Sequence, residues 1–275
     1  MLHARGVYAD ISNTDYHKDP ALGSTSLKTL ATRTPAHYLH DQAHPKQSAA
    51  FDLGTVAHSL ILEQDESGVV VIEAEAKRGK VWTEPAEKAA AEGKIALTSK
   101  EWEQVRGMRD SVMAHDVAGP LFRGHLAEQS VFWEEDGLHL KCRPDAWRFD
   151  ALVDLKTTVN ADPREFGKTA YNFGYHQSAA HYQDGVRTVA GETLPFIFVL
   201  VEKTAPYLVS VVELDEVALD YGRQMNDRAK RVYRECVKTG RWPGYPNAEP
   251  VSLPMFGMYQ LDDLLGLNTE LEIKF

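Results

Sequence analysis

Residues 142–158, with the sequence CRPDAWRFDALVDLKTT, decide the fold of this 275-residue chain. Asp145 follows a proline there, and Asp154 and Lys156 stand two positions apart in the apolar run that comes next. Side chains alternate between the two faces of a strand, so Asp154 and Lys156 are expected to point to the same face. A short turn separates the two runs, which predicts that Asp145 lies across from Asp154 on a neighbouring strand. Two carboxylates and one ammonium group therefore converge.

Converging carboxylates repel each other, and a divalent cation relieves that repulsion. Mg²⁺ prefers oxygen ligands, can polarise a phosphoryl oxygen and lowers the pKa of a bound water. Lys156 adds a positive charge that can orient the attacking water or stabilise charge on the phosphorus centre. The alternative is an exposed Asp154–Lys156 ion pair, since D-x-K tripeptides are common. The Pro144-Asp145 dipeptide, the strand–turn–strand context and the apolar neighbours favour a nuclease site with Asp145, Asp154 and Lys156 as catalytic residues.

Hydrophobic patterns on both sides place this stretch in an α/β fold. Strands are predicted at residues 69–73, 127–135, 138–147, 151–157, 195–202 and 207–214. Helices are predicted at residues 24–39, 51–63, 86–93, 98–114, 163–171, 176–189 and 216–238. Asp136-Gly137 is typical of a tight hairpin turn, so three of the strands form a predicted meander. The order of elements indicates a central mixed sheet flanked by helices.

A length of 275 residues is enough for one large or two small domains, and we expect a single nuclease domain over residues 1–275. Its predicted parts are a mainly helical part at 1–120, a catalytic core at 127–240 and a loop-rich tail at 241–275. No run of eighteen apolar residues is present, so no membrane helix is expected. The first ten residues lack the apolar core of a signal peptide, which predicts a cytoplasmic protein.

Charge and cysteine usage exclude some classes of protein. A net charge of -10 argues against coating DNA through a broad basic face, but allows a local basic channel. Cys142 and Cys236 form no CxxC pair, which argues against a zinc knuckle or an iron–sulfur cluster. Both are expected to be reduced.

The motifs together resemble the PD-(D/E)xK nuclease superfamily, whose signature P-D-x8-D-L-K is matched from Pro144 to Lys156. A longer series is similar to the RecE-type (exonuclease VIII) phage recombination exonucleases. It comprises Tyr16-His17, GSTSLKTL, FDLGTVAHSLILE, CRPD through DLKTT, FGKTAY and HYQDG. The resemblance covers roughly residues 8–254 and implies a restriction-endonuclease-like core.

The resemblance also implies further metal ligands. In this group a helical histidine before the meander binds the metal, and His58 stands at that position. Without the resemblance, a histidine in an apolar helix is more often a core residue. The backbone carbonyl of Leu155 would join His58, Asp145 and Asp154 as a ligand. Glu128 opens the first meander strand, where related nucleases can carry an acidic residue; the alternative is a surface glutamate.

Relatives also carry a glutamine and a tyrosine four residues apart on the helix after the D-x-K strand. Tyr182 fits the tyrosine, but position 178 is Ser178 and the glutamine is Gln177. Gln177 and Tyr182 do not share a helix face well, because helix neighbours are three or four residues apart. Both are expected to line the site, with core packing as the alternative for Tyr182, and the effect of Ser178 stays open.

The resemblance implies a Mg²⁺-dependent 5′-to-3′ exonuclease that acts on linear double-stranded DNA, with Mn²⁺ as a substitute metal. It implies phage-type homologous recombination, a RecT-like single-strand annealing protein as partner and a homo-oligomeric ring around DNA. A ring would reconcile the acidic chain with DNA binding, since only its channel need be basic. The alternatives are an endonuclease or single-strand nuclease of the same superfamily, or a catalytically inactive DNA-binding relative. A Cas4-like enzyme usually holds a four-cysteine cluster, which two cysteines cannot build.

Overall fold

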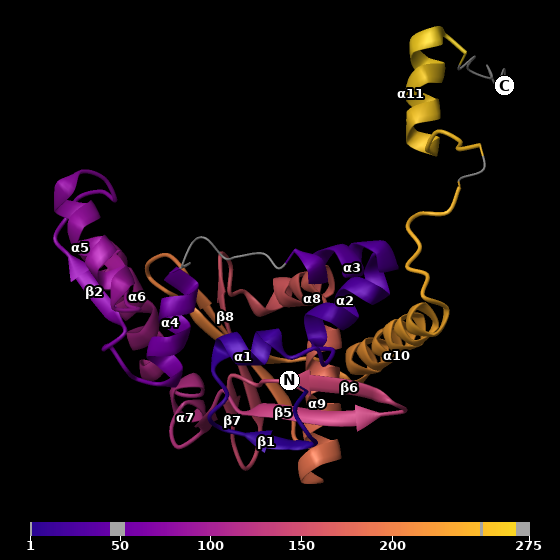
Figure 1. Cartoon of the computed structure of the whole chain (residues 1–275). Helices are drawn as coiled ribbons and strands as arrows, with labels where there is room; N and C mark the ends of the chain where they lie inside the picture. The colour runs from indigo at the N-terminus through magenta and orange to yellow at the C-terminus, as the bar shows by residue number, and fades with distance from the viewer. Residues whose placement is uncertain (1, 45–52, 248–249, 268–275) are drawn as a thin grey trace. The chain divides into compact units, whose positions relative to one another are not determined.

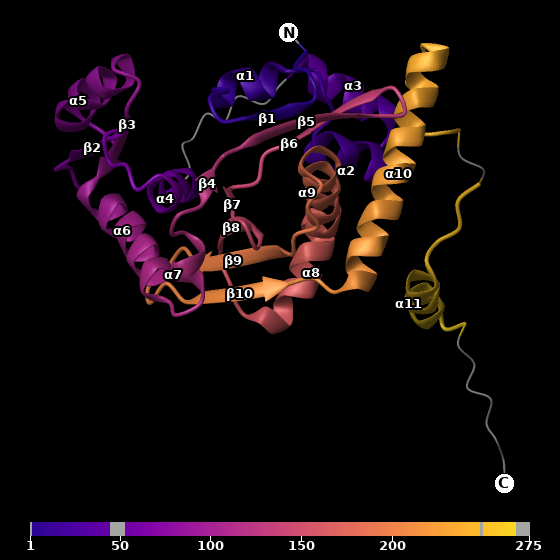
Figure 2. The same cartoon turned by 90° about the horizontal axis from the view of Figure 1, so that it is seen from below.

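A five-stranded sheet forms the centre of the main unit (Figures 1 and 2). The computed structural model describes residues 2–44, 53–247 and 250–267, and the chain divides into two compact units, 1–242 and 243–275. The strands, in spatial order, are β10 (Val209–Glu213), β9 (Phe196–Glu202), β8 (Leu152–Thr158), β7 (Ala146–Trp147) and β4 (Leu126–Ala127). Strands β8 and β9 pair in parallel and the other pairs are antiparallel, so the sheet is mixed, as the sequence predicted.

The predicted three-strand meander is wrong in one respect, because it is divided between two sheets. Strands β5 (Ser130–Glu135) and β6 (Leu138–Cys142) form the expected hairpin, but they pair with β1 (Gly6–Tyr8) in a separate sheet. The predicted strand at 138–147 therefore ends at Cys142, and the chain, which left the central sheet after β4, returns to it with β7. Pro144 lies at this break, and a proline has no N–H to continue a central ladder.

A smaller βαβ unit precedes the core. Strand β2 (Val69–Ile72) pairs in parallel with β3 (Ile95–Thr98), and α5 (Lys80–Ala91) connects them. The predicted strand at 69–73 is confirmed. The predicted helix at 86–93 starts too late: α5 begins directly after Gly79, and Pro85 lies inside it.

Helices cover both faces of the central sheet, and strand alternation decides which side chains each face buries. Val153 and Leu155 of β8 belong to a core with α4 (Leu53–Leu62) and α6 (Ser99–Ala114). Leu152 belongs to the opposite core, with residues of α2 (Ser24–Thr32), α9 (Tyr175–Ala190) and α10 (Glu216–Thr239). The even-numbered positions of β8, Asp154 and Lys156 included, therefore face α2 and α9.

Sequence signals set several helix ends. Thr98 and Glu101 form the predicted capping box of α6. The predicted helix at 24–39 is interrupted, as expected at Pro35, which starts α3 (Pro35–Ala43). The predicted helix at 51–63 is α4, and its first two residues lie outside the described ranges. The remaining short helices of this unit are α1 (Asn13–Lys18) and α7 (Ala118–Leu121).

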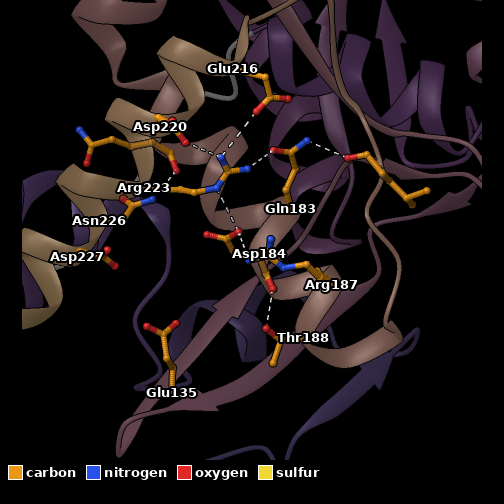
Figure 3. Close-up of polar contacts among 12 residues, drawn as sticks. Glu135, Gln183, Asp184, Arg187, Thr188, Glu216, Asp220, Arg223, Asn226 and Asp227 are labelled. Atoms are coloured by element: carbon orange, nitrogen blue, oxygen red, sulfur yellow. Dashed lines mark hydrogen bonds and ion pairs between the residues drawn. The ribbon is translucent and has the colours of Figure 1, made fainter.

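Helices α9 and α10 pack closely. A Cβ atom at Gly222 of α10 would lie 2.2 Å from the carbonyl oxygen of His176, so only glycine permits this approach. Arg223 then ties the two helices: its guanidinium donates to Gln183 and Asp184 of α9 at 3.4 Å each (Figure 3). Helix α8 (Pro163–Phe173) leads into α9 through Gly174, whose φ of 64° ends one helix and begins the next.

The second unit contains helix α11 (Met255–Leu265), which ends at Gly266 with a φ of 67°. This helix lies in the tail that was predicted to be rich in loops. Among the described residues, no helix has both the length and the apolar character that crossing a membrane requires.

Candidate active site

Asp145, the residue before β7, lies opposite Asp154 of β8. Ala146 pairs with Val153, so Asp145 and Asp154 form the next cross-strand position. Their side chains are 13% and 9% exposed. The strand register therefore places the two residues opposite each other.

His58 and Glu128 bring two further side chains to Asp145. His58 Nε2 lies 2.8 Å from Asp145 Oδ2, and His58 Nδ1 lies 3.8 Å from Glu128 Oε1. One ligand atom from each of these three residues lies within 4.8 Å of the others. The apolar face of α4 is buried in the core, which leaves His58 half-buried on its other side.

Pro144 explains how the backbone of Leu155 becomes available to the site. Arg148 N–H donates to the Ala151 carbonyl, so these two residues form a hydrogen-bonded pair of the antiparallel ladder. Every second pair is of this kind, and continuing the register places Pro144 opposite Leu155 in such a pair. Proline offers no N–H to the Leu155 carbonyl. The Leu155 N–H instead donates to Asp145 Oδ2 at 2.7 Å. The N–H and C=O of one strand residue point the same way, so this carbonyl is directed toward the Asp145 side.

Lys156 forms an ion pair with Asp154 and lies 5.3 Å from the centre of the Tyr175 ring. Burial acts to lower the pKa of Lys156, but the charges of Asp154 and Asp145 outweigh it and raise that pKa. Lys156 is therefore held as a cation beside both carboxylates.

The acidic groups differ in their tendency to ionise. Burial raises the pKa of Asp154, and the negative charge of Asp145 adds to that effect. Burial also acts on Asp145, but the charge and hydrogen bond of His58 outweigh it and lower its pKa. Burial and the charge of Asp145 raise the pKa of Glu128 to about 7. The site therefore holds one carboxylate whose pKa is lowered, that of Asp145, next to two whose pKa is raised, those of Asp154 and Glu128.

A cavity of about 710 Å³ opens beside these residues. His58, Glu128, Leu155 and Lys156 line it, and residues 11–13 of the N-terminal segment form part of its wall. The cavity gives a substrate access to the cluster.

Arg143 also lines this cavity, and the sequence analysis did not single it out. Its guanidinium donates to Ser130 Oγ and to the Ile11 carbonyl, lies 4.1 Å from the centre of the Tyr16 ring, and stands 3.9 Å from Glu128 Oε2. Arg143 thus provides a fixed positive charge next to Glu128. Its position two residues before Asp145 on an extended chain is the signal that could have identified it.

Gln177 and Tyr182 lie farther inside the fold. Gln177 is buried on α9, and its backbone carbonyl accepts from Asn226 Nδ2 at 2.9 Å. Tyr182 packs on Phe196, with ring centroids 5.7 Å apart. Burial raises the pKa of its hydroxyl, and the negative charge of Asp154 adds to that rise. Ser178, at the position where relatives have glutamine, is half-buried.

The donor set fits a hard divalent cation. It combines carboxylate oxygens, a backbone carbonyl and an imidazole, and oxygen ligands are those that Mg²⁺ prefers. Opposite ligands of Mg²⁺ stand about 4.2 Å apart, and the His58, Glu128 and Asp145 donor atoms lie within 4.8 Å of one another. His58 and Asp145 are predicted ligands in this set, whereas Glu128 was predicted only to line the site and Asp154 is not in the set.

Comparisons with known proteins show the family and the fold of the chain. Residues 23–251 match the model of a family described as a PDDEXK-like domain of unknown function (DUF3799). A solved structure from Eubacterium rectale, described as a candidate exonuclease, is 15% identical, with 93% of this chain and 98% of that chain covered and a TM-score of 0.58. An alkaline exonuclease (LHK-Exo) from Laribacter hongkongensis is 11% identical, with 68% of this chain and 96% of that chain covered. Its TM-score of 0.29 is too low to show a shared fold. No curated protein matches the chain.

Proposed function

This chain belongs to the PDDEXK-like family (DUF3799), and on that basis we propose that it is a Mg²⁺-dependent DNA exonuclease of the RecE type. The observation that carries the proposal is the cluster of His58, Glu128 and Asp145 beside the Asp154–Lys156 pair. A generic ion pair on a sheet face would not have His58, Glu128 and Lys156 lining one cavity beside it. Family membership supports nuclease chemistry for the same cluster.

The proposed roles follow from the chemistry of each group. His58, Asp145, Asp154 and the Leu155 carbonyl would hold the cation. When bound, Mg²⁺ supplies Lewis acidity toward a phosphoryl oxygen and a water molecule, and Mn²⁺ can substitute. Lys156 stabilises the negative charge that develops on the phosphorus centre. Glu128 adds a carboxylate at the same cavity, where it can orient a water.

Exonuclease action, rather than another nuclease activity, is supported by the motif series along the chain. The proposed substrate is the end of linear duplex DNA, cut by phosphodiester hydrolysis in the 5′-to-3′ direction during phage-type recombination. The proposed partners are a RecT-like annealing protein and further copies of this chain in a ring. A ring would confine the positive charge to a channel and so accommodate a net charge of -10.

The test is digestion of end-labelled linear duplex with Mg²⁺, beside the same DNA as a closed circle. We expect loss of the linear duplex from its 5′ ends, survival of the circle, and no digestion by an Asp154→Asn variant. Cleavage of the circle would indicate an endonuclease, and preference for single strands would indicate a single-strand nuclease. Intact DNA in both samples, with Mg²⁺ and with Mn²⁺, would indicate a non-catalytic DNA-binding relative.

A further inference from the structure

A second lysine reaches the corner between α8 and α9, and its charge interacts with that of Lys156. Lys28 of α2 donates from its ammonium to the carbonyl oxygen of Phe173 at 3.3 Å. Its side chain lies across Gly174, where a Cβ atom would be 2.7 Å from Lys28 Cδ. Gly174 also has a φ of 64°, so the corner needs glycine for its backbone and for this contact. Lys28 is therefore held at a defined place.

The two ammonium groups influence each other. Burial lowers the pKa of Lys28, the charge of Lys156 lowers it further, and the charge of Asp154 opposes both. Like charges that are partly removed from water are unfavourable unless an anion lies near them. An ammonium has three donors, and within the described residues the hydrogen bond to the Phe173 carbonyl engages one of those of Lys28. The remaining donors are suited to an anion such as a phosphate.

A series of stacked aromatic rings ends at the same corner. Phe198 is buried, and Tyr175 stacks on it with centroids 5.7 Å apart. Phe173 stacks on Tyr175 at 5.6 Å with an interplanar angle of 19°, and it is 62% exposed. The inner rings fix the orientation of the outer ring. A fixed and exposed ring next to cations is the combination on which a nucleobase stacks.

We propose that Lys28 and Phe173 form a nucleotide subsite in which Lys28 binds the phosphate next to the scissile one and Phe173 stacks on a base. The subsite rests on the proposed nuclease function and extends it, because it names residues that hold the strand on the α8–α9 side of Lys156. The phosphate contact carries no sequence information, and every base has a face that can stack. The subsite is therefore expected to act on any sequence.

The phosphate contact is tested by DNA binding without metal, so that cleavage does not interfere. The dissociation constant for a linear duplex is measured over a series of salt concentrations. Lys28→Ala should lower the slope of log affinity against log salt by about 0.7–0.9, which corresponds to one phosphate contact. Lys28→Arg should keep the slope, and Lys168→Ala, at an exposed lysine of α8, is the matched control.

The stacking contact has a different signature. Phe173→Ala should weaken binding by about fivefold to a hundredfold with no change in slope, because stacking displaces no counterions. Phe173→Trp should restore binding. Tyr171→Ala removes a 78% exposed ring from the same helix and serves as the control.

The outcomes separate the subsite from the proposed function. If the wild type digests linear duplex with Mg²⁺ and both alanine variants bind like their controls, the subsite is wrong and the nuclease function stands. A lower melting temperature of Lys28→Ala with an unchanged salt slope would make Lys28 a structural contact to the end of α8 and would also overturn the subsite. If the variants show the expected binding defects but the wild type cleaves nothing, the subsite stands and catalysis is wrong. No DNA binding by the wild type would overturn both.

Discussion

His58 Nε2 lies 2.8 Å from Asp145 Oδ2, and this contact joins helix α4 to the residue before strand β7. Burial lowers the pKa of His58, but the charge of Asp145 and the hydrogen bond between them outweigh burial and raise that pKa to about 9. A proton therefore stays on His58 at neutral pH when no metal is bound. An imidazole must be neutral to bind a metal, so metal binding has to release this proton.

We therefore expect Mg²⁺ affinity to rise with pH between about 7.5 and 9 and to level off above 9. Isothermal titration calorimetry in two buffers with different heats of ionisation would measure both the affinity and the proton release. His58→Ala should bind Mg²⁺ more weakly and lose this pH dependence. Constant affinity across that pH range would show that His58 is not a ligand.

The same pKa predicts how the stability of the metal-free protein depends on pH. A histidine whose pKa is raised on folding stabilises the folded state fully below its ordinary value of 6.5. That stabilisation is lost as the pH rises through about 9. The melting temperature of the wild type should fall between pH 7 and 9 more steeply than that of His58→Gln. Parallel curves for the two proteins would contradict the His58–Asp145 pairing.

Asp145→Asn and Asp154→Asn should each abolish Mg²⁺-dependent cleavage, because each removes a proposed ligand charge. The fold should persist because Asn has the shape of Asp. Burial and repulsion already oppose the charge of Asp154, whereas Asp145→Asn also loses the ion pair with His58. Cleavage is measured on linear duplex, and circular dichroism melting checks the fold. A near-wild-type rate for either variant would place the active site elsewhere.

Lys156→Ala should slow cleavage by about 10²–10³, the usual cost of one lost electrostatic contact to a transition state. Single-turnover rates at saturating enzyme separate this loss from DNA binding, which should change far less. Lys203→Ala, at the lysine just after β9, is the control. A loss confined to DNA affinity would make Lys156 a binding residue rather than a catalytic one.

The pairing of Asp145, Asp154 and Lys156 could be predicted from the sequence because it depends on local rules. Alternation along β8 sets the common face of Asp154 and Lys156, and a short turn aligns β7 with β8. Thr98 and Pro35 were informative for the same reason, since a cap or a helix start is decided within a few residues.

Contacts between distant segments could not be predicted in this way. Lys28 approaches Lys156 only because α2 packs on the same face of the sheet as α9, and no periodicity encodes that pairing. The division of the meander at Pro144 follows from which sheet accepts each strand. Glu128 lies near His58 because its φ of 52° turns the chain between β4 and β5, an uncommon conformation for glutamate.

The α9–α10 contact makes a last prediction, about stability. Gly222→Ala should destabilise the protein by about 1–3 kcal/mol or more, because the added methyl group would meet the His176 carbonyl oxygen. Gly167→Ala is the matched control on α8: apart from adjacent residues and the backbone of its own helix, no described atom lies within 4 Å of its Cβ position. The gain in helix propensity should therefore stabilise by up to about 1 kcal/mol. Urea unfolding of both variants measures the difference. Equal stability of Gly222→Ala and wild type would mean that α10 can move away from α9. Since α9 begins at Tyr175, beside Lys156, such freedom would loosen the support of the site.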